Sequence, residues 1–198
     1  MTLPGPDAVV VRDAEAEVVR MLGGQGRLLA DADATEGALS TMRVTLERGA
    51  DGATPHYHGG SSELFFVISG RAQVLTGERV VTAGPGDLVV VPPHLPHAFA
   101  AAPGSPVDLL IVIAPGVERF EYFRLLERVG RGEASVEDVL AAQDRFDNHF
   151  LDSTAWQAAR AAARKEAGCE VRDGSGKAAP GDAGAAAGDA PARDTPAG

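Results

Sequence analysis

The sequence is poor in cysteine, in positive charge and in long apolar runs. One of its 198 residues is cysteine, which excludes an intramolecular disulfide framework and a cysteine-rich zinc site. Eighteen basic residues stand against 28 acidic ones, and the net charge is −10. Nucleic acid and anionic membranes are both bound by concentrated basic surfaces, so we expect neither as a partner.

The apolar runs are too short to cross a membrane. The longest, such as Leu109–Ala114, lie far below the roughly 20 residues that a bilayer requires. The first residues, MTLPGPDAVVVRD, lack the basic start and the apolar core of a signal peptide. We therefore expect a soluble, cytoplasmic protein.

The patterning of the sequence divides the chain into three parts. Residues 1–115 are expected to form a β-barrel, residues 116–172 a helical appendage, and residues 173–198 a disordered tail. The tail is mostly Ala, Gly and Pro and has no Val, Ile, Leu or aromatic residue. Such a segment cannot bury enough apolar surface to offset the entropy lost on ordering.

Short apolar runs broken by Gly, Pro and Asp predict many short strands, as in a sandwich or a barrel. The stretches 64–68, 88–91 and 109–114 are apolar at every position, which indicates that both of their faces are covered. The expected strands cover residues 8–12, 16–22, 26–31, 38–47, 53–58, 62–69, 71–76, 79–82, 87–92, 97–101 and 107–114.

After Pro115 the apolar spacing becomes helical. An apolar residue recurs every three or four positions from Tyr122 to Val129, which predicts a helix over roughly 117–129. A second helix is expected to begin at Ser135, with Asp138 completing a capping box. A third is expected over 154–167. We expect the first two to pack on the barrel exterior or at a subunit contact.

Four of the five histidines fall within 42 consecutive residues, and three of them can meet at one point. His56 and His58 are two apart in a strand, so both rings face the same side. The Gly59-Gly60 turn then lets the next strand return and places Glu63 opposite them. His97 opens a further strand. Three imidazoles and one carboxylate suit a divalent Fe, Mn, Co, Ni, Cu or Zn ion.

These residues also form two motifs that resemble those of the cupin superfamily. In the first, His56-x-His58 is followed after four residues by Glu63 and after six more by Gly70. In the second, Gly86, Pro92 and His97 match, while His94 stands where the motif has Gly and Ala101 where it has Asn. The chain is thus similar to small single-domain (type-2) bacterial cupins, including quercetinase-like monocupins.

The resemblance implies an all-β, double-stranded β-helix (jelly-roll) barrel with helices after it and one divalent transition metal near its centre. By motif match the metal ligands are His56, His58, Glu63 and His97. His94 is expected to be a turn residue, since histidine tolerates positive φ better than most side chains. A hydrogen bond near a helix end is expected for His149, rather than metal ligation. Tyr57 is expected to pack outward between the two ligand histidines.

Four further residues are candidates for a substrate pocket. Phe65 and Val67 share the strand parity of Glu63, and Phe99 shares that of His97, so these three either line a pocket or fill the barrel. No Lys or Arg occurs in residues 49–70 or 80–118. The remaining candidate cation, Arg43, faces either the pocket or solvent. If it is exposed, the site is apolar and suits a neutral, hydrophobic, enol-bearing or aromatic ligand.

Three functions remain open at this stage. The first is a metal-dependent dioxygenase-type enzyme in which Glu63 accepts a proton from a small substrate, or a related Lewis-acid isomerase or cyclase. The second is a non-catalytic cupin that binds a metal or a small ligand. The third is a structural or interaction protein in which the metal only stabilises the barrel. A homodimer is expected, with Ala8–Arg12 and Glu17–Leu22 as candidate contacts.

Overall fold

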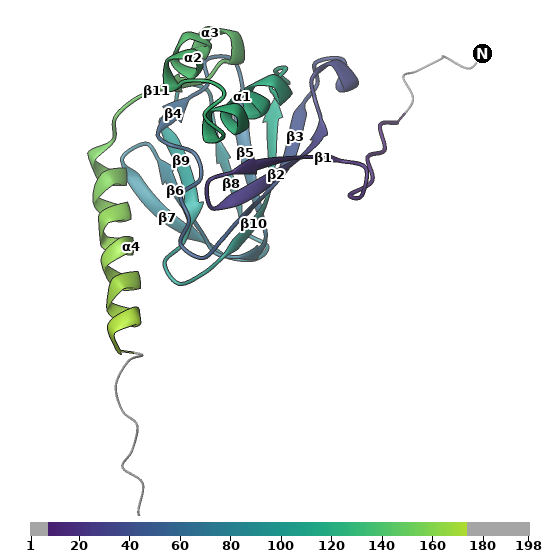
Figure 1. Ribbon diagram of the computed structural model, residues 1–198. Coiled ribbons are helices and arrows are strands. Elements are labelled where there is room, and N and C mark those ends of the chain that lie inside the picture. The colour runs from purple at the N-terminus through teal and green to yellow at the C-terminus, as the bar shows by residue number, and fades with distance from the viewer. Residues whose placement is uncertain (1–7, 174–198) are drawn as a thin grey trace, which may run out of the picture.

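Two antiparallel sheets face each other in the computed structural model, which describes residues 8–173 (Figure 1). The larger sheet has the spatial order β1 (Glu17–Met21), β2 (Gly24–Ala30), β3 (Ser40–Leu46), β10 (Val107–Ala114), β5 (Ser62–Gly70) and β8 (Leu88–Val91). The smaller has the order β11 (His149–Phe150), β4 (His56–Tyr57), β9 (His97–Ala101), β6 (Ala72–Thr76) and β7 (Arg79–Ala83). Because β10 lies between β3 and β5, the strands wind into the expected jelly-roll barrel, which is thereby confirmed.

The core lies between the inner faces of the two sheets. Along β3, the residues Met42, Val44 and Leu46 are buried, and the residues between them lie closer to solvent. This period-2 alternation gives each strand one inward apolar face. Phe65 and Val67 on β5 meet the same core, as their parity with Glu63 predicts.

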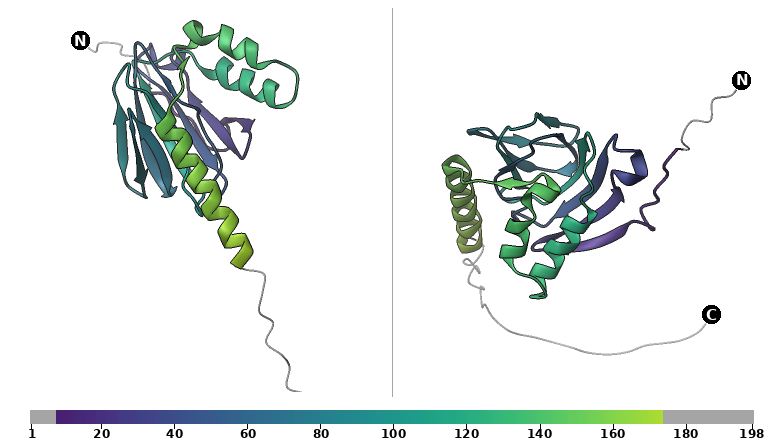
Figure 2. Two further views of the ribbon diagram at one scale, coloured as in Figure 1. Left: turned by 90° about the vertical axis from the view of Figure 1, so that its left-hand side faces the viewer. Right: turned by 90° about the horizontal axis from the view of Figure 1, so that it is seen from above.

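Three short helices gather at one end of the barrel: α1 (Phe120–Gly130), α2 (Val136–Ala141) and α3 (Gln143–Phe146) (Figure 2). Four buried side chains hold them together: Tyr122, Leu125, Val139 and Phe146. The capping box of Ser135 and Asp138 is present, so the predicted start of the second helix is confirmed. A one-turn 3-10 helix, η1 (Asp33–Thr35), lies between β2 and β3.

The last helix, α4 (Thr154–Asp173), runs along the outer face of the smaller sheet (Figures 1 and 2). Trp156 packs there on Leu75, Ala98 and Ala100. The helix is longer than the expected 154–167. None of the helices within residues 8–173 combines the length and the apolar composition needed to cross a membrane.

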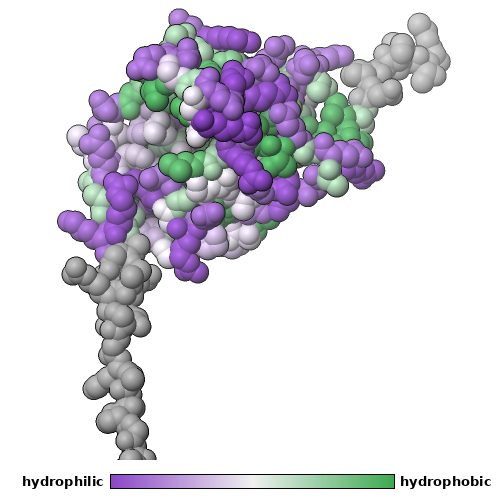
Figure 3. Space-filling view, in the orientation of Figure 1, coloured by the Kyte–Doolittle hydropathy of each residue, from purple (hydrophilic) through white to green (hydrophobic). Residues whose placement is uncertain are grey.

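The observed strands differ from the expected ones near the start and near the end of the described chain. Residues 8–12 form no strand, and Val9, Val10 and Val11 are exposed where the described chain begins, as the hydrophobic surface there shows (Figure 3). An apolar run alone does not make a strand, because a strand needs a partner for its backbone hydrogen bonds. The two-residue strand β11 was not expected. Apart from Asp173, the expected tail lies outside the described residues.

Candidate metal centre and substrate pocket

Four side chains from four places in the chain meet inside the barrel. His56 lies on β4, His58 follows it directly, Glu63 lies on β5 and His97 opens β9. One ligand atom from each of them lies within 4.8 Å of the others. All four residues are at most 5% exposed. The structure thus brings together the complete set of predicted metal ligands.

Backbone carbonyls fix the orientation of each imidazole. Nδ1 lies 2.8 Å from the Thr54 carbonyl in His56 and 2.8 Å from the Leu95 carbonyl in His97. In His58 it lies 2.5 Å from the carbonyl of Asp147. With Nδ1 donating, Nε2 of each ring carries a lone pair, as a metal ligand requires.

Two buried atoms at this centre have no hydrogen bond. His97 Nε2 lies 2.8 Å from Glu63 Oε2, but neither atom has a partner of acceptable hydrogen-bond geometry. A buried polar atom without a partner is costly, and a bound cation would satisfy both. The three nitrogens and one oxygen therefore fit a divalent transition metal, which is the cofactor that this donor set suits.

The protonation states also suit a metal. Burial and the neighbouring His97 hold the pKa of His56 well below its usual range, so its imidazole is neutral. Burial acts to raise the pKa of Glu63, but the adjacent imidazoles of His58 and His97 outweigh it and hold that pKa well below its usual range. Neutral imidazole and ionised carboxylate are the forms that bind a metal ion.

A pocket adjoins this centre and shares Glu63 with it. Its enclosed volume is small, about 20 Å³, and the surrounding atom-free space of about 270 Å³ includes open solvent. Its walls come from β3, β5, β10 and the start of α1. The lining residues are Ser40, Thr41, Met42, Glu63, Ile111, Ile113, Arg119, Phe120 and Phe123.

Arg119 brings a positive charge into this pocket. The residue is 4% exposed, and its Nη1 lies 3.2 Å from Nε2 of His58. The guanidinium also lies over the rings of Tyr122 and Phe123. No carboxylate among the described residues forms an ion pair with it, and its Nε has no hydrogen-bond partner. The expectation of a site without a nearby cation is therefore wrong.

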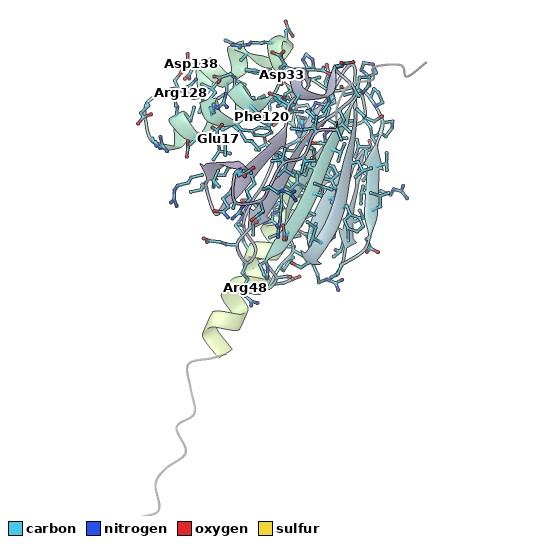
Figure 4. All side chains as sticks on the ribbon, turned by 90° about the vertical axis from the view of Figure 1, so that its right-hand side faces the viewer. Glu17, Asp33, Arg48, Phe120, Arg128 and Asp138 are labelled. Atoms are coloured by element: carbon cyan, nitrogen blue, oxygen red, sulfur yellow. The ribbon has the colours of Figure 1, made fainter. Side chains whose placement is uncertain are left out.

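Asp31, far away in the sequence, sets the direction of Arg119. The two Asp31 carboxylate oxygens accept hydrogen bonds from the backbone N–H groups of Arg119 and Phe120, each at 2.9 Å. A carboxylate at these orphan donors stabilises the start of a helix. The first turn of α1 is thereby fixed against the barrel, and Phe120 points toward it (Figure 4).

The candidate pocket residues from the sequence lie elsewhere. Phe65, Val67 and Phe99 belong to the barrel core, and none of them lines the pocket beside Glu63. Arg43 lies on the outer face of β3, where its guanidinium pairs with Asp108 and reaches Asp13. The cation that lines the pocket is Arg119, which stands one residue beyond the stretch that lacks Lys and Arg.

The other two histidines are not among the candidate metal ligands. His94 is exposed with φ 65°, which confirms it as a turn residue. His149 lies on β11, where its ring stacks on Tyr57 and Nε2 lies 3.3 Å from an oxygen of Asp147. Tyr57 packs outward as expected.

A signal for Arg119 was present in the sequence. Arg119, Tyr122, Leu126 and Val129 follow one another at helical spacing, so the arginine lies on the apolar stripe of α1. A cation on the buried face of a helix that covers a barrel is a candidate site residue. Asp31 carried no comparable signal, because its contacts with α1 span 88 and 89 positions.

Residues 42–113 match the family model described as Cupin domain. Together with the jelly roll and the buried group of three histidines and one glutamate, this match confirms the resemblance to cupins: residues 42–113 form a cupin domain. None of the curated proteins compared with the chain matches it.

Several solved structures are similar to the barrel. A variant of Streptomyces PAC13 with uridine is 19% identical, over 58% of this chain and 87% of that one, with a TM-score of 0.48. KdgF from Halomonas sp. is 23% identical, over 55% and 94%, with a TM-score of 0.49. A mutant of Bacillus subtilis oxalate decarboxylase OxdC is 24% identical, over 52% and 28%, with a TM-score of 0.46. At this level of identity, they identify no activity for this chain.

Proposed function

We propose that this chain is a metal-dependent enzyme whose substrate is a small molecule with an apolar body and an acidic group, bound between Glu63 and Arg119. One observation carries the proposal. Both side chains line the same pocket and carry opposite charges. Of the two, Glu63 also belongs to the group that could hold a metal. A substrate in the pocket would therefore touch a proton acceptor and a cation together.

The surroundings of Arg119 support an acidic substrate group. A guanidinium that is buried without a carboxylate partner is costly, since desolvation of the charge is not offset by an ion pair. A carboxylate or enolate in the pocket would supply the missing negative charge. Arginine binds such groups through strong, charge-assisted hydrogen bonds.

Proton transfer is the chemistry that the residues support best. A divalent ion bound by His56, His58, Glu63 and His97 would lower the pKa of a substrate hydroxyl or enol oxygen. Glu63 would accept that proton at a carboxylate oxygen. Arg119 holds the acidic group and stabilises the negative charge that develops. This favours an isomerase, lyase or cyclase acting next to an acid or enol.

A dioxygenase-type reaction is the second candidate, and the apolar walls of the pocket favour it. Met42, Ile111, Ile113, Phe120 and Phe123 supply most of the lining. Such walls exclude water and would protect a reactive carbanion until oxygen adds to it. This reaction consumes oxygen, whereas proton transfer does not, so the two candidates are separable in one assay.

The test begins with the metal content of the purified protein, measured by mass spectrometry. The metal-loaded protein is then incubated with pairs of small enolisable acids and their methyl esters, in air and under argon. We expect exchange of the C–H hydrogen for deuterium in D2O under argon with the acids and not with the esters. Oxygen consumption in air without anaerobic exchange would support the dioxygenase. Bound metal without either reaction would contradict an enzyme.

Three variants separate the roles. Glu63→Gln should lower turnover by about two to four orders of magnitude, which is more than it lowers metal occupancy. Arg119→Gln should raise KM for the acids and leave the metal content unchanged. Arg128→Gln is the matched control, because Arg128 lies at the outer end of the same helix, away from Phe120 and the barrel (Figure 4). Equal kinetics for Arg119→Gln and Arg128→Gln would contradict the proposed role of Arg119.

A further inference from the structure

Asn148 is buried beside Arg119 in a network that fixes its side chain. The residue is 2% exposed and lies between α3 and β11. Its Oδ1 accepts a hydrogen bond from Arg119 Nη2 at 3.0 Å, and its Nδ2 donates to the Tyr122 hydroxyl at 3.3 Å. Because a guanidinium has donors only, the amide oxygen must face Arg119. Arg119 is therefore held by an uncharged group.

The backbone before Asn148 is attached to the metal centre. Asp147 has φ 47°, and its carboxylate accepts hydrogen bonds from the N–H groups of Gly59 at 2.6 Å and Gly60 at 2.9 Å. Its carbonyl is the one that orients His58. Asp147 and Asn148 are consecutive in the chain. Their hydrogen bonds therefore fix the position of His58 relative to that of Arg119.

The neutrality of Asn148 has a chemical consequence. A carboxylate at this position would form a buried ion pair with Arg119 and compete with any acidic group in the pocket. An amide of the same size supplies the hydrogen bond without the charge. We propose that Asn148 is a positioning and specificity-determining residue, which holds Arg119 in the pocket while leaving its positive charge available to the acidic group of the substrate. This inference rests on the proposed function of the pocket.

The variant Asn148→Asp tests this directly, because it changes the charge and hardly the size. The protein is loaded with Zn(II), which is redox-inactive, and titrated by calorimetry with benzoate and with its neutral counterpart benzamide. We expect Asn148→Asp to lower the affinity for benzoate about 10- to 100-fold, as the loss of a charge-assisted hydrogen bond implies. Benzamide affinity and zinc content should stay the same. Gln157→Glu, which adds the same charge on the exposed side of α4, should change none of them.

The outcomes separate the inference from the proposal beneath it. If Arg119→Gln weakens benzoate binding and Asn148→Asp does not, Asn148 has only a structural role and the inference is overturned. If wild-type protein binds benzoate no better than benzamide, or Arg119→Gln changes neither, the proposed acidic substrate falls as well. Should Asn148→Asp fail to fold, Asn148→Ser and Asn148→Ala replace it. The serine hydroxyl can accept the hydrogen bond, so serine should retain more benzoate affinity than alanine, and equal affinities would overturn the inference.

Discussion

Arg160 and Arg119 are both almost completely buried, but their surroundings differ. Arg160, on α4, donates to the Asp51 carboxylate, the Gln73 side chain and the backbone carbonyls of Gly49 and Ala101, at 2.7 to 3.0 Å. Arg119 has no carboxylate partner among the described residues, and its Nε has no partner there. An arginine whose three nitrogens all donate hydrogen bonds fastens a helix to a sheet. An arginine left with a free donor beside a pocket is suited to a ligand.

The largest expected effect separates the two arginines by stability. Arg160→Met should lower the free energy of unfolding by about 3 kcal/mol, because it leaves buried carbonyls without donors. Arg119→Met should change it by no more than about 1 kcal/mol, since an apolar side chain replaces a buried charge that has no ion pair. Urea unfolding of both variants measures the difference. Equal losses would show that Arg119 is a structural anchor like Arg160.

Metal binding should stabilise the folded protein by nearly as much as Arg160→Met destabilises it. At a free metal concentration about 100-fold above Kd, the expected gain in unfolding free energy is about 2.7 kcal/mol. Thermal unfolding with and without a chelator measures this gain in wild type and in Arg160→Met. The gain should be the same in both, because Trp156 of α4 packs on Leu75, Ala98 and Ala100 and not on a candidate ligand side chain, and it should vanish in His97→Ala. If the gain differed between wild type and Arg160→Met, the metal centre and the α4 anchor would not be energetically independent.

The pH dependence of the unfolding free energy should come from the metal centre and not from Arg160 on α4. The pKa of His56 is well below 6.5 in the folded protein, so the unfolded chain takes up a proton there first. Stability of the chelated protein is therefore complete above pH 6.5 and is lost as the pH falls below it, by up to about 1.4 kcal/mol per pH unit. Urea unfolding from pH 8 to pH 5.5 measures the slope. Arg160→Met should show the same slope, and a flat profile in wild type would contradict a buried neutral His56.

Arg43 should show the smallest effect. Its guanidinium pairs with Asp108 at 2.6 Å on the outer face of β3, and its side chain is 37% exposed. Arg43→Gln should lower the free energy of unfolding by about 1 kcal/mol or less, as partly exposed ion pairs generally do. Benzoate affinity of the zinc-loaded protein should not change. If Arg43→Gln lowered benzoate affinity as much as Arg119→Gln does, Arg43 would have to be counted as a binding residue of the site.

The metal centre could be predicted from the sequence because its determinants are local. The strand period, the turn at Gly59 and the spacing to Glu63 lie within a few residues of one another, and His97 begins a strand of its own. The helix start at Ser135 is equally local. Such patterns fix the direction of a side chain without knowledge of the tertiary fold.

The pocket could not be predicted in the same way, because long-range contacts build it. Arg119 reaches the site through the Asp31 carboxylate, and Asn148 reaches it through β11, which pairs with β4 from 92 positions away (His149 with Tyr57). The failed strand at residues 8–12 has the same cause, since an apolar run reveals nothing about its partner. Strand parity correctly predicted that Phe65 and Val67 face inward. Which inward-facing residues line a pocket, however, depends on how α1 packs on the barrel.

The pairing of β11 with β4 has a consequence for how the site matures. A nascent chain that ends at Pro115 already contains all four metal-binding side chains, but it lacks Arg119, Asn148 and the carbonyl that orients His58. The completed site therefore has to wait until residue 150 has left the ribosome. A chain that terminates after the barrel would thus contain the four candidate metal ligands without Arg119 and Asn148.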